Sequence, residues 1–254
     1  MLPVLANDRQ PAARAARSLY RHFAVKLLSL WQFENGREIE AMFPDRGGLE
    51  MIARLRQGGR GVLVLGPHLG NWEIGAPMLV KHGIPLTVIT QAEPGRGLTE
   101  LRAASRARWG VETLVIGTDS FAFVEVIKRL QDGAVVALLV DRPPPAGGVM
   151  VEFFGRPFRA SPAAAELARA SGCALVGVTV VDVPGGCEVR MLPEFTYDRR
   201  ALGDRAARQE LTGRILRAFE PRIREHPEQW YHFVPLWPAS SPEVPPEGAG
   251  GNES

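Results

Sequence analysis

The order of apolar segments restricts the fold of this chain more than any other feature. Short apolar runs follow turn signals, which is typical of buried strands, and longer stretches that favour helix separate several of them. Such alternation predicts an α/β fold: a single layered domain with a largely parallel central sheet flanked by helices. The expected strands are 62–65, 86–90, 113–116, 135–140, 175–183 and 188–192, and the expected helices are 72–81, 98–109, 120–131, 162–171 and 205–225.

The length of 254 residues allows one sizeable core and requires no second domain. We expect the ordered domain to cover 12–238, after a flexible N-terminus at 1–11. The residues from 239 to 254 are rich in Pro, Gly, Ser and Glu, so a disordered tail is predicted there. No apolar run reaches the roughly 18 residues that a membrane-spanning helix needs, and we therefore expect no spanning segment.

The segment 12–31 is amphipathic when placed on a helix. Its basic residues lie opposite most of its apolar residues, and the first 26 residues carry a basic excess that suits an anionic surface. Two interpretations stay open: a helix packed on the domain core, or an interfacial helix lying on a membrane. The apolar side holds Leu19, Tyr20, Phe23, Leu27, Leu30 and Trp31, and the other side Arg14, Arg17, Ser18, Arg21, His22 and Ser29.

Motif absences exclude several function classes. The two cysteines, Cys173 and Cys187, are not spaced as metal ligands, and no H-E-x-x-H occurs, so no metal is predicted. So few cysteines fit a reducing cytosolic location. A P-loop, a dinucleotide-binding G-x-G-x-x-G and a G-x-S-x-G elbow are also lacking, which argues against an NTPase, a dehydrogenase and a serine hydrolase. We expect neither a cofactor nor a nucleic-acid partner.

The segment GPHLGNWE at 66–73 carries the chemistry-bearing residues. It follows an expected strand and precedes an expected helix, so it lies at the carboxyl end of a strand, where α/β sheets place ligands. His68 and Glu73 can meet only if His68 lies in the turn and Glu73 in the first helical turn. Gly70 supplies a turn conformation, and Asn71 is a good N-cap.

A histidine and a carboxylate in contact form a general base. The neutral imidazole accepts a proton from an attacking hydroxyl, while a carboxylate on its other ring nitrogen fixes the tautomer and stabilises the imidazolium. We expect Glu73 to orient His68 and to hold the imidazole pKa near or above its ordinary value of ~6.5. Spacing alone also fits a capping Glu73 beside a solvent-facing His68.

Several segments together resemble one enzyme family. HLGNWE at 68–73 is similar to the H-x4-[D/E] motif of the bacterial lipid A biosynthesis (lauroyl/myristoyl) acyltransferase family, in the lysophospholipid acyltransferase superfamily. The similar segments follow the family's order over roughly residues 12 to 238: RARWG at 106–110, VDR at 140–142, GV at 148–149, FFGRP at 153–157, AELARASGC at 165–173 and HPEQW at 226–230.

The resemblance implies a glycerolipid acyltransferase-like fold and direct acyl transfer without an acyl-enzyme. The donor would be a thioester of acyl carrier protein or coenzyme A, and the acceptor a hydroxyl of a membrane glycolipid or phospholipid. His68 would be the general base and Glu73 its partner, on a protein attached peripherally to the cytoplasmic membrane face. The alternatives are a non-catalytic lipid-binding protein and a thioester hydrolase.

Two departures from the family's pattern bear on the acceptor. VPLW at 234–237 stands where lipid A enzymes commonly carry a His-Arg-Arg-Trp-like segment, and the usual N-terminal membrane span is missing. The C-terminal segment looks closer to the phosphatidylinositol mannoside acyltransferase branch.

Further residues are predicted to bind substrate. Arg106 is predicted to bind a phosphate or the thioester oxygen. Asp141 and Arg142 follow an expected strand, where α/β sheets place site residues. Phe154 is predicted to border an acyl pocket between 141 and 159. Each has a structural alternative: a helix-end cation, an ion pair opening a turn, a core aromatic or a solvated arginine. The residues are Asn71, Arg106, Asp141, Arg142, Phe154 and Arg156, whereas His22, His82, His226 and His232 are interpreted as surface or packing residues.

Overall fold

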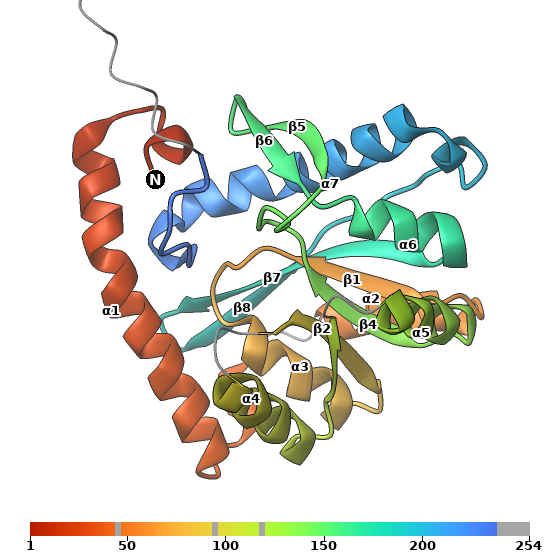
Figure 1. Ribbon diagram of the computed structural model, residues 1–254. Coiled ribbons are helices and arrows are strands. Elements are labelled where there is room, and N and C mark those ends of the chain that lie inside the picture. Colours follow the sequence, from red (N-terminus) through yellow and green to blue (C-terminus); the bar gives the residue numbers. More distant parts are fainter. Residues whose placement is uncertain (44–46, 93–95, 117–119, 238–254) are drawn as a thin grey trace, which may run out of the picture.

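The computed structural model describes residues 1–43, 47–92, 96–116 and 120–237. Within these ranges a six-stranded sheet is covered by helices on both faces (Figure 1). The tail expected at 239–254 lies outside the described residues. The α-helices are α1 (Arg9–Glu34), α2 (Gly47–Gln57), α3 (Trp72–Lys81), α4 (Arg96–Arg108), α5 (Ser120–Gln131), α6 (Ala163–Ser171) and α7 (Arg205–Glu225), and the 3-10 helices are η1 (Leu2–Leu5), η2 (Ile39–Met42), η3 (Ala201–Gly203) and η4 (Pro227–Gln229).

The strands of the main sheet follow the order β3-β2-β4-β1-β7-β8. All neighbouring pairs are parallel except the last, in which β8 runs antiparallel to β7. The predicted α/β class and the largely parallel sheet are therefore confirmed. The strands are β1 (Val62–Gly66), β2 (Leu86–Gln91), β3 (Glu112–Ile116), β4 (Val135–Leu139), β7 (Ala174–Val183) and β8 (Gly186–Met191).

Helices cover both faces of β1, which explains its uninterrupted apolar sequence. Leu63 and Leu65 pack in a cluster with α5, α6 and α7, whereas Val62 and Val64 pack on the other side with α2 and α3. Every residue of β1 is buried. A strand buried on both faces gives no apolar–polar alternation, as is usual for parallel sheets.

The pairing of β1 with β4 positions the site. Gly66 of β1 lies in register with Leu139 of β4. Because the strands are parallel, the residues that follow them leave the sheet at the same edge. His68 and Asp141, each two positions beyond its strand, consequently arrive side by side.

A hairpin and a helix are absent from the sequence-based prediction. Residues 149–160 form an antiparallel hairpin of β5 (Val149–Phe153) and β6 (Arg156–Ala160). This hairpin packs on α7. Helix α2 was also not predicted. The N-terminal residues expected to be flexible include η1, whose Val4 is buried in the main core cluster.

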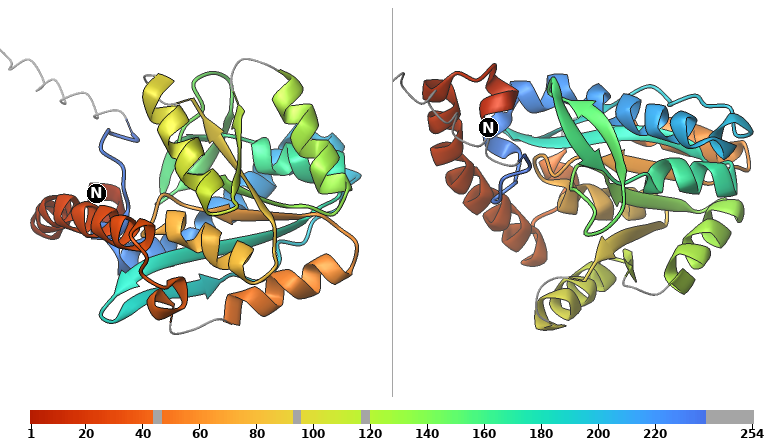
Figure 2. Two further views of the ribbon diagram at one scale, coloured as in Figure 1. Left: turned by 90° about the horizontal axis from the view of Figure 1, so that it is seen from below. Right: turned by 45° about the horizontal axis from the view of Figure 1, so that its top comes forward.

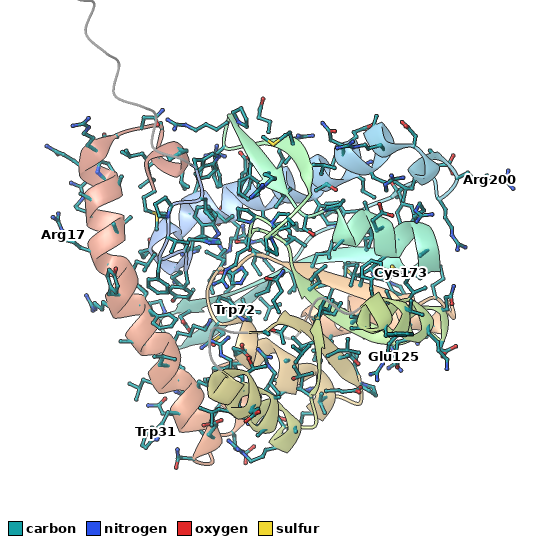
Figure 3. All side chains as sticks on the ribbon, viewed as in Figure 1. Arg17, Trp31, Trp72, Glu125, Cys173 and Arg200 are labelled. Atoms are coloured by element: carbon teal, nitrogen blue, oxygen red, sulfur yellow. The ribbon has the colours of Figure 1, made fainter. Side chains whose placement is uncertain are left out.

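Helix α1 lies along one side of the layered body, as Figures 1 and 2 show from different directions. Its inner side contacts the body through buried Leu19 and through Phe23, which packs edge-on against Tyr231. Its outer side carries exposed apolar residues, and in Figure 3 Arg17 and Trp31 project away from the body. Within the described residues, no helix combines the length and the apolar character needed to cross a membrane.

Candidate functional site

The turn between β1 and α3 is fixed from two sides. On one side the carbonyl of His68 accepts a hydrogen bond from Tyr231 N–H at 2.8 Å. On the other, Asn71 N–H donates to the carbonyl of Val180 in β7 at 2.6 Å. Gly70 has φ +62°, and a Cβ there would lie 2.0 Å from the Val180 oxygen, so only glycine fits.

The carboxylate on the His68 ring belongs to Asp141. The distance between His68 Nδ1 and Asp141 Oδ1 is 2.6 Å, and the His68 backbone N–H donates to Asp141 Oδ2 at 2.8 Å. The sequence-based assignment gave this position to Glu73, which instead contacts Arg106. The physical reason is the β1–β4 register, which brings the end of β4 to the turn, whereas Glu73 already lies on α3.

Asp141 is also held by the C-terminal segment. Its Oδ2 accepts hydrogen bonds from Trp230 Nε1 at 2.7 Å and from His232 Nε2 at 2.9 Å. Burial of this carboxyl acts to raise its pKa, but His68 and His232 outweigh that effect and hold the pKa well below its usual range. Asp141 is therefore ionised and accepts hydrogen bonds at both oxygens. His232 is neither a surface residue nor mere packing.

This arrangement fixes the tautomer of His68. Because ionised Asp141 can only accept, Nδ1 carries the proton and Nε2 keeps its lone pair. No described residue is hydrogen-bonded to Nε2, and His68 lines the main cavity. Burial lowers the pKa of His68, and the opposing effect of Asp141 does not restore it. The lowered pKa departs from our expectation, and it favours the neutral, proton-accepting imidazole at neutral pH.

Glu73 forms a bidentate salt bridge with Arg106 from α4. Arg106 Nε donates to Glu73 Oε2 at 3.0 Å, and Nη2 donates to Oε1 at 2.6 Å. Both side chains are buried and line the cavity. Burial acts to raise the pKa of Glu73, but Arg106 outweighs it and lowers the pKa below its ordinary value. The pair joins α3 to α4 beside His68.

Glu73→Gln is expected to destabilise the protein, because it leaves the Arg106 guanidinium buried without its counter-charge. Breaking such a buried pair costs about 3–5 kcal/mol. The depressed pKa of Glu73 means that its contribution is present above the unfolded-state pKa of ~4.3 and is lost as pH falls through the folded-state value. Urea unfolding at pH 7 and at about pH 3 measures this, and the mutational loss should shrink at the lower pH. Glu125→Gln, whose partner Arg129 is more exposed, is the control. An equal loss at both pH values would contradict the assignment.

A cavity of about 1120 Å³ opens beside His68. Apolar side chains supply most of its surroundings, and they come from α1, α3, α4 and strands of the main sheet. His68, Trp72, Glu73 and Arg106 are among its lining residues. A space of this size accommodates a ligand with a long hydrocarbon portion, with the imidazole beside it.

The remaining predicted residues lie at different distances from this cavity. Arg142 lines it. Asn71 is fully buried, is not among the lining residues, and makes no side-chain cap bond although it holds the N-cap position of α3. Phe154 packs against Phe153, Trp230 and Trp237 rather than lining the cavity. Arg156 donates to Asn7 Oδ1 at 2.8 Å.

The described residues contain one grouping with the ligand types of a metal site. His68, Asp141 and His232 offer ligand atoms within 4.8 Å of one another. These same atoms are joined by the hydrogen bonds given above. We therefore assign the grouping to the hydrogen-bond network that orients His68.

Comparison with known proteins places these features in a family. Residues 6–238 match the family described as bacterial lipid A biosynthesis acyltransferase. A phosphatidylinositol mannoside acyltransferase of Mycolicibacterium smegmatis is 27% identical over 225 residues, which are 88% of this chain and 71% of that protein. The protein of the same name from Mycobacterium tuberculosis is 30% identical over 199 residues, which are 78% of this chain and 61% of that protein. The chain belongs to the bacterial lipid A biosynthesis acyltransferase family.

Proposed function

We propose that this protein transfers a fatty acyl group from an acyl carrier protein or coenzyme A thioester to a hydroxyl of a membrane glycolipid or phospholipid. The observation that supports it most is the His68 imidazole, oriented by buried Asp141, at the edge of a large and mainly apolar cavity. The relatives named above suggest a phosphatidylinositol mannoside or a similarly built glycolipid as acceptor.

The proposed step is direct. His68 Nε2 accepts the proton of the acceptor hydroxyl while the oxygen attacks the thioester carbonyl carbon. Asp141 stabilises the imidazolium that forms. When the C–S bond breaks, the imidazolium returns the proton to the leaving thiolate, so no acyl-enzyme forms and His68 ends neutral. Backbone N–H groups at the start of α3, a few residues after His68, are proposed to donate hydrogen bonds to the oxyanion that develops on the thioester carbonyl.

Glu73 has a different part in this proposal from the one its spacing suggests. Its bonds to Arg106 tie α4 to the start of α3, which follows directly on the turn that carries His68. We propose that Glu73 acts as a positioning residue and that Asp141 is the partner of the base. Arg106 and Arg142 remain candidates for contacts with substrate.

The test is a transfer assay with purified protein. Radiolabelled palmitoyl-coenzyme A is incubated with phosphatidylinositol mannoside, with phosphatidylinositol or with water alone, and the lipids are analysed by mass spectrometry. We expect acylated lipid to exceed released fatty acid. Release of fatty acid without acylated lipid would favour a thioester hydrolase, and binding without either product would favour a lipid-binding protein.

The outer side of α1 supports peripheral attachment to the cytoplasmic membrane face. Tyr20, Leu27 and Trp31 form a stripe at helical spacing, and each is about half or more exposed. Arg17 and Arg21 lie exposed beside this stripe. A helix with exposed apolar residues flanked by cations is suited to the boundary between lipid headgroups and acyl chains.

Replacing Arg14, Arg17 and Arg21 together with Gln is expected to weaken binding to anionic vesicles about 100-fold, because each cation near an anionic surface contributes about 1 kcal/mol and every 1.4 kcal/mol corresponds to about tenfold. Binding of the unmodified protein should also fall as salt is raised. Co-sedimentation with phosphatidylglycerol vesicles measures both. The matched control replaces exposed Arg199, Arg200 and Arg205 with Gln, and Arg200 lies at the end of the molecule away from α1 (Figure 3). If both triple variants bind like the unmodified protein, α1 is not the attachment surface.

A further inference from the structure

Lys26 is the cation of α1 that points inward. It is only 3% exposed, whereas the arginines of the same helix are exposed. Its Nζ lies 2.8 Å from the centroid of the Trp72 ring and 5.1 Å from that of Tyr231. No described residue forms a hydrogen bond or an ion pair with this ammonium. Lys26 lines the same cavity as His68.

A buried ammonium without a counter-charge is unfavourable, and aromatic contact offsets only part of the cost. Burial lowers the pKa of Lys26 well below its ordinary value, against the smaller opposing effects of Glu73 and Asp182. Packing alone does not require this residue, since an apolar side chain of similar length fills the same volume. Such an arrangement is typical of a site whose counter-charge arrives with the ligand.

The charges around the cavity favour an anion. Arg106 and Arg142 line it together with Lys26. Its carboxylate Glu73 is already engaged by Arg106, and the other lining carboxylate, Glu34, contacts Arg108. Cationic side chains thus exceed the carboxylates available to them.

Two residues that line the cavity carry a further buried donor without a hydrogen-bond partner among the described residues. These are the Tyr231 hydroxyl and Nη1 of Arg106, whose Nε and Nη2 are used by Glu73. Unsatisfied buried donors are rare in native structures and call for an explanation. A phosphate group would supply the negative counter-charge for the Lys26 ammonium and acceptor oxygens for these two donors.

We propose that Lys26 is the centre of a phosphate-binding subsite in the His68 cavity. Trp72 and Tyr231 position the ammonium by their ring faces, and Tyr231 and Arg106 supply additional donors. Because this inference rests on the proposed function, the phosphate comes from one of two substrates: the phosphodiester of a phospholipid acceptor, or the phosphate of the donor's phosphopantetheine arm. Binding it beside His68 sets the reacting hydroxyl or thioester at the base.

The test uses the full-length protein with Lys26→Met, which removes the charge at similar volume, and Lys26→Arg, which keeps it. Lys128→Met, at an exposed position on α5, is the control. We expect Lys26→Met to raise the KM of the phosphate-bearing substrate roughly 10- to 100-fold, which corresponds to about 1.4–2.8 kcal/mol. Lys26→Arg should stay within a few fold of the unmodified protein.

Paired substrates identify the source of the phosphate. If the acceptor supplies it, KM rises for phosphatidylinositol mannoside but not for a phosphate-free alkyl mannoside. If the donor supplies it, KM rises for palmitoyl-coenzyme A but not for palmitoyl-N-acetylcysteamine. Unchanged KM values for all four substrates in Lys26→Met would overturn the proposal.

Two readouts do not depend on turnover. Without ligand, Lys26→Met should melt at an equal or higher temperature, because it removes an isolated buried charge; a purely structural lysine would give a lower one. Calorimetric titration with inorganic phosphate should show binding that Lys26→Met weakens and Lys128→Met does not. Lysine-dependent phosphate binding in a protein that transfers no acyl group would support the subsite and overturn the proposed function. Transfer activity with neither a KM change nor lysine-dependent phosphate binding would support the proposed function and overturn the phosphate subsite.

Discussion

His68→Ala is expected to abolish nearly all acyl transfer while the protein stays folded. A positioned general base contributes about 100- to 10,000-fold, and the imidazole is the group with a free ring nitrogen on the cavity. The measurement is the initial rate of transfer from palmitoyl-coenzyme A to a lipid acceptor, with circular dichroism to verify folding. His82→Ala, at the opposite end of α3, is the matched control and should retain activity.

The pH dependence of the same reaction gives a second view of His68. The base works when neutral, so the rate should rise as pH passes through its pKa. Because burial lowers that pKa, the rising limb should lie below the ordinary value of ~6.5. A folded His68→Ala protein with most of its activity intact would remove this mechanism.

Asp141→Asn is expected to lower the rate of acyl transfer to a comparable extent, although Asp141 is a buried residue. The carboxylate accepts from His68, Trp230 and His232, and an amide turns one of its oxygens into a donor that faces N–H groups. His68 then loses the partner that fixes its tautomer, for which about a 10,000-fold fall in kcat is the expected order. Stability should fall by about 3–5 kcal/mol as the buried network is broken.

Two controls separate these effects. Asp132→Asn, in an exposed turn, should leave both rate and stability unchanged. A double variant of His68→Ala with Asp141→Asn should be scarcely slower than His68→Ala, because the two residues act as one unit. If the rate losses of the two single variants multiply in the double variant, Asp141 contributes to catalysis independently of His68.

Stability against pH gives an independent check on Asp141. Its pKa is depressed, so the carboxylate stabilises the folded protein above the unfolded-state value of ~3.9, and this contribution is lost as pH falls through the folded-state pKa. The unmodified protein and Asp141→Asn should therefore approach each other in stability only under strongly acidic conditions.

Periodicity predicted most of the main sheet but not the neighbours of its strands. The segment 62–65 reads as a strand because all of its residues are apolar, and it is β1 in the structure. Nothing in that pattern indicates that β4 lies beside it rather than β2. This adjacency decides which carboxylate meets His68, so the partner of the base could not be derived from the spacing of HLGNWE.

Long-range contacts explain the other differences. The hairpin β5–β6 was not predicted, because a Pro- and Gly-rich stretch precedes it and Met150, between Val149 and Val151, breaks the apolar–polar alternation of a strand. The carboxylate nearest to His232 in sequence is Glu228, but the partner of this histidine, Asp141, lies 91 positions away. Lys26 reads as one more cation on a basic helix, and only the packing of α1 on Trp72 distinguishes it.

The C-terminal position of residues 230–232 has a consequence for when the site is completed during translation. The turn that carries His68 forms early in the chain, but Trp230, Tyr231 and His232 complete its surroundings only after all the sheet strands have been made. Chains are synthesised from the N-terminus, and their contacts form as the partners become available. A nascent chain that has already emerged with α1 and β1 therefore lacks the groups that hold Asp141. Competence for acyl transfer should therefore appear only after residue 232 has been synthesised.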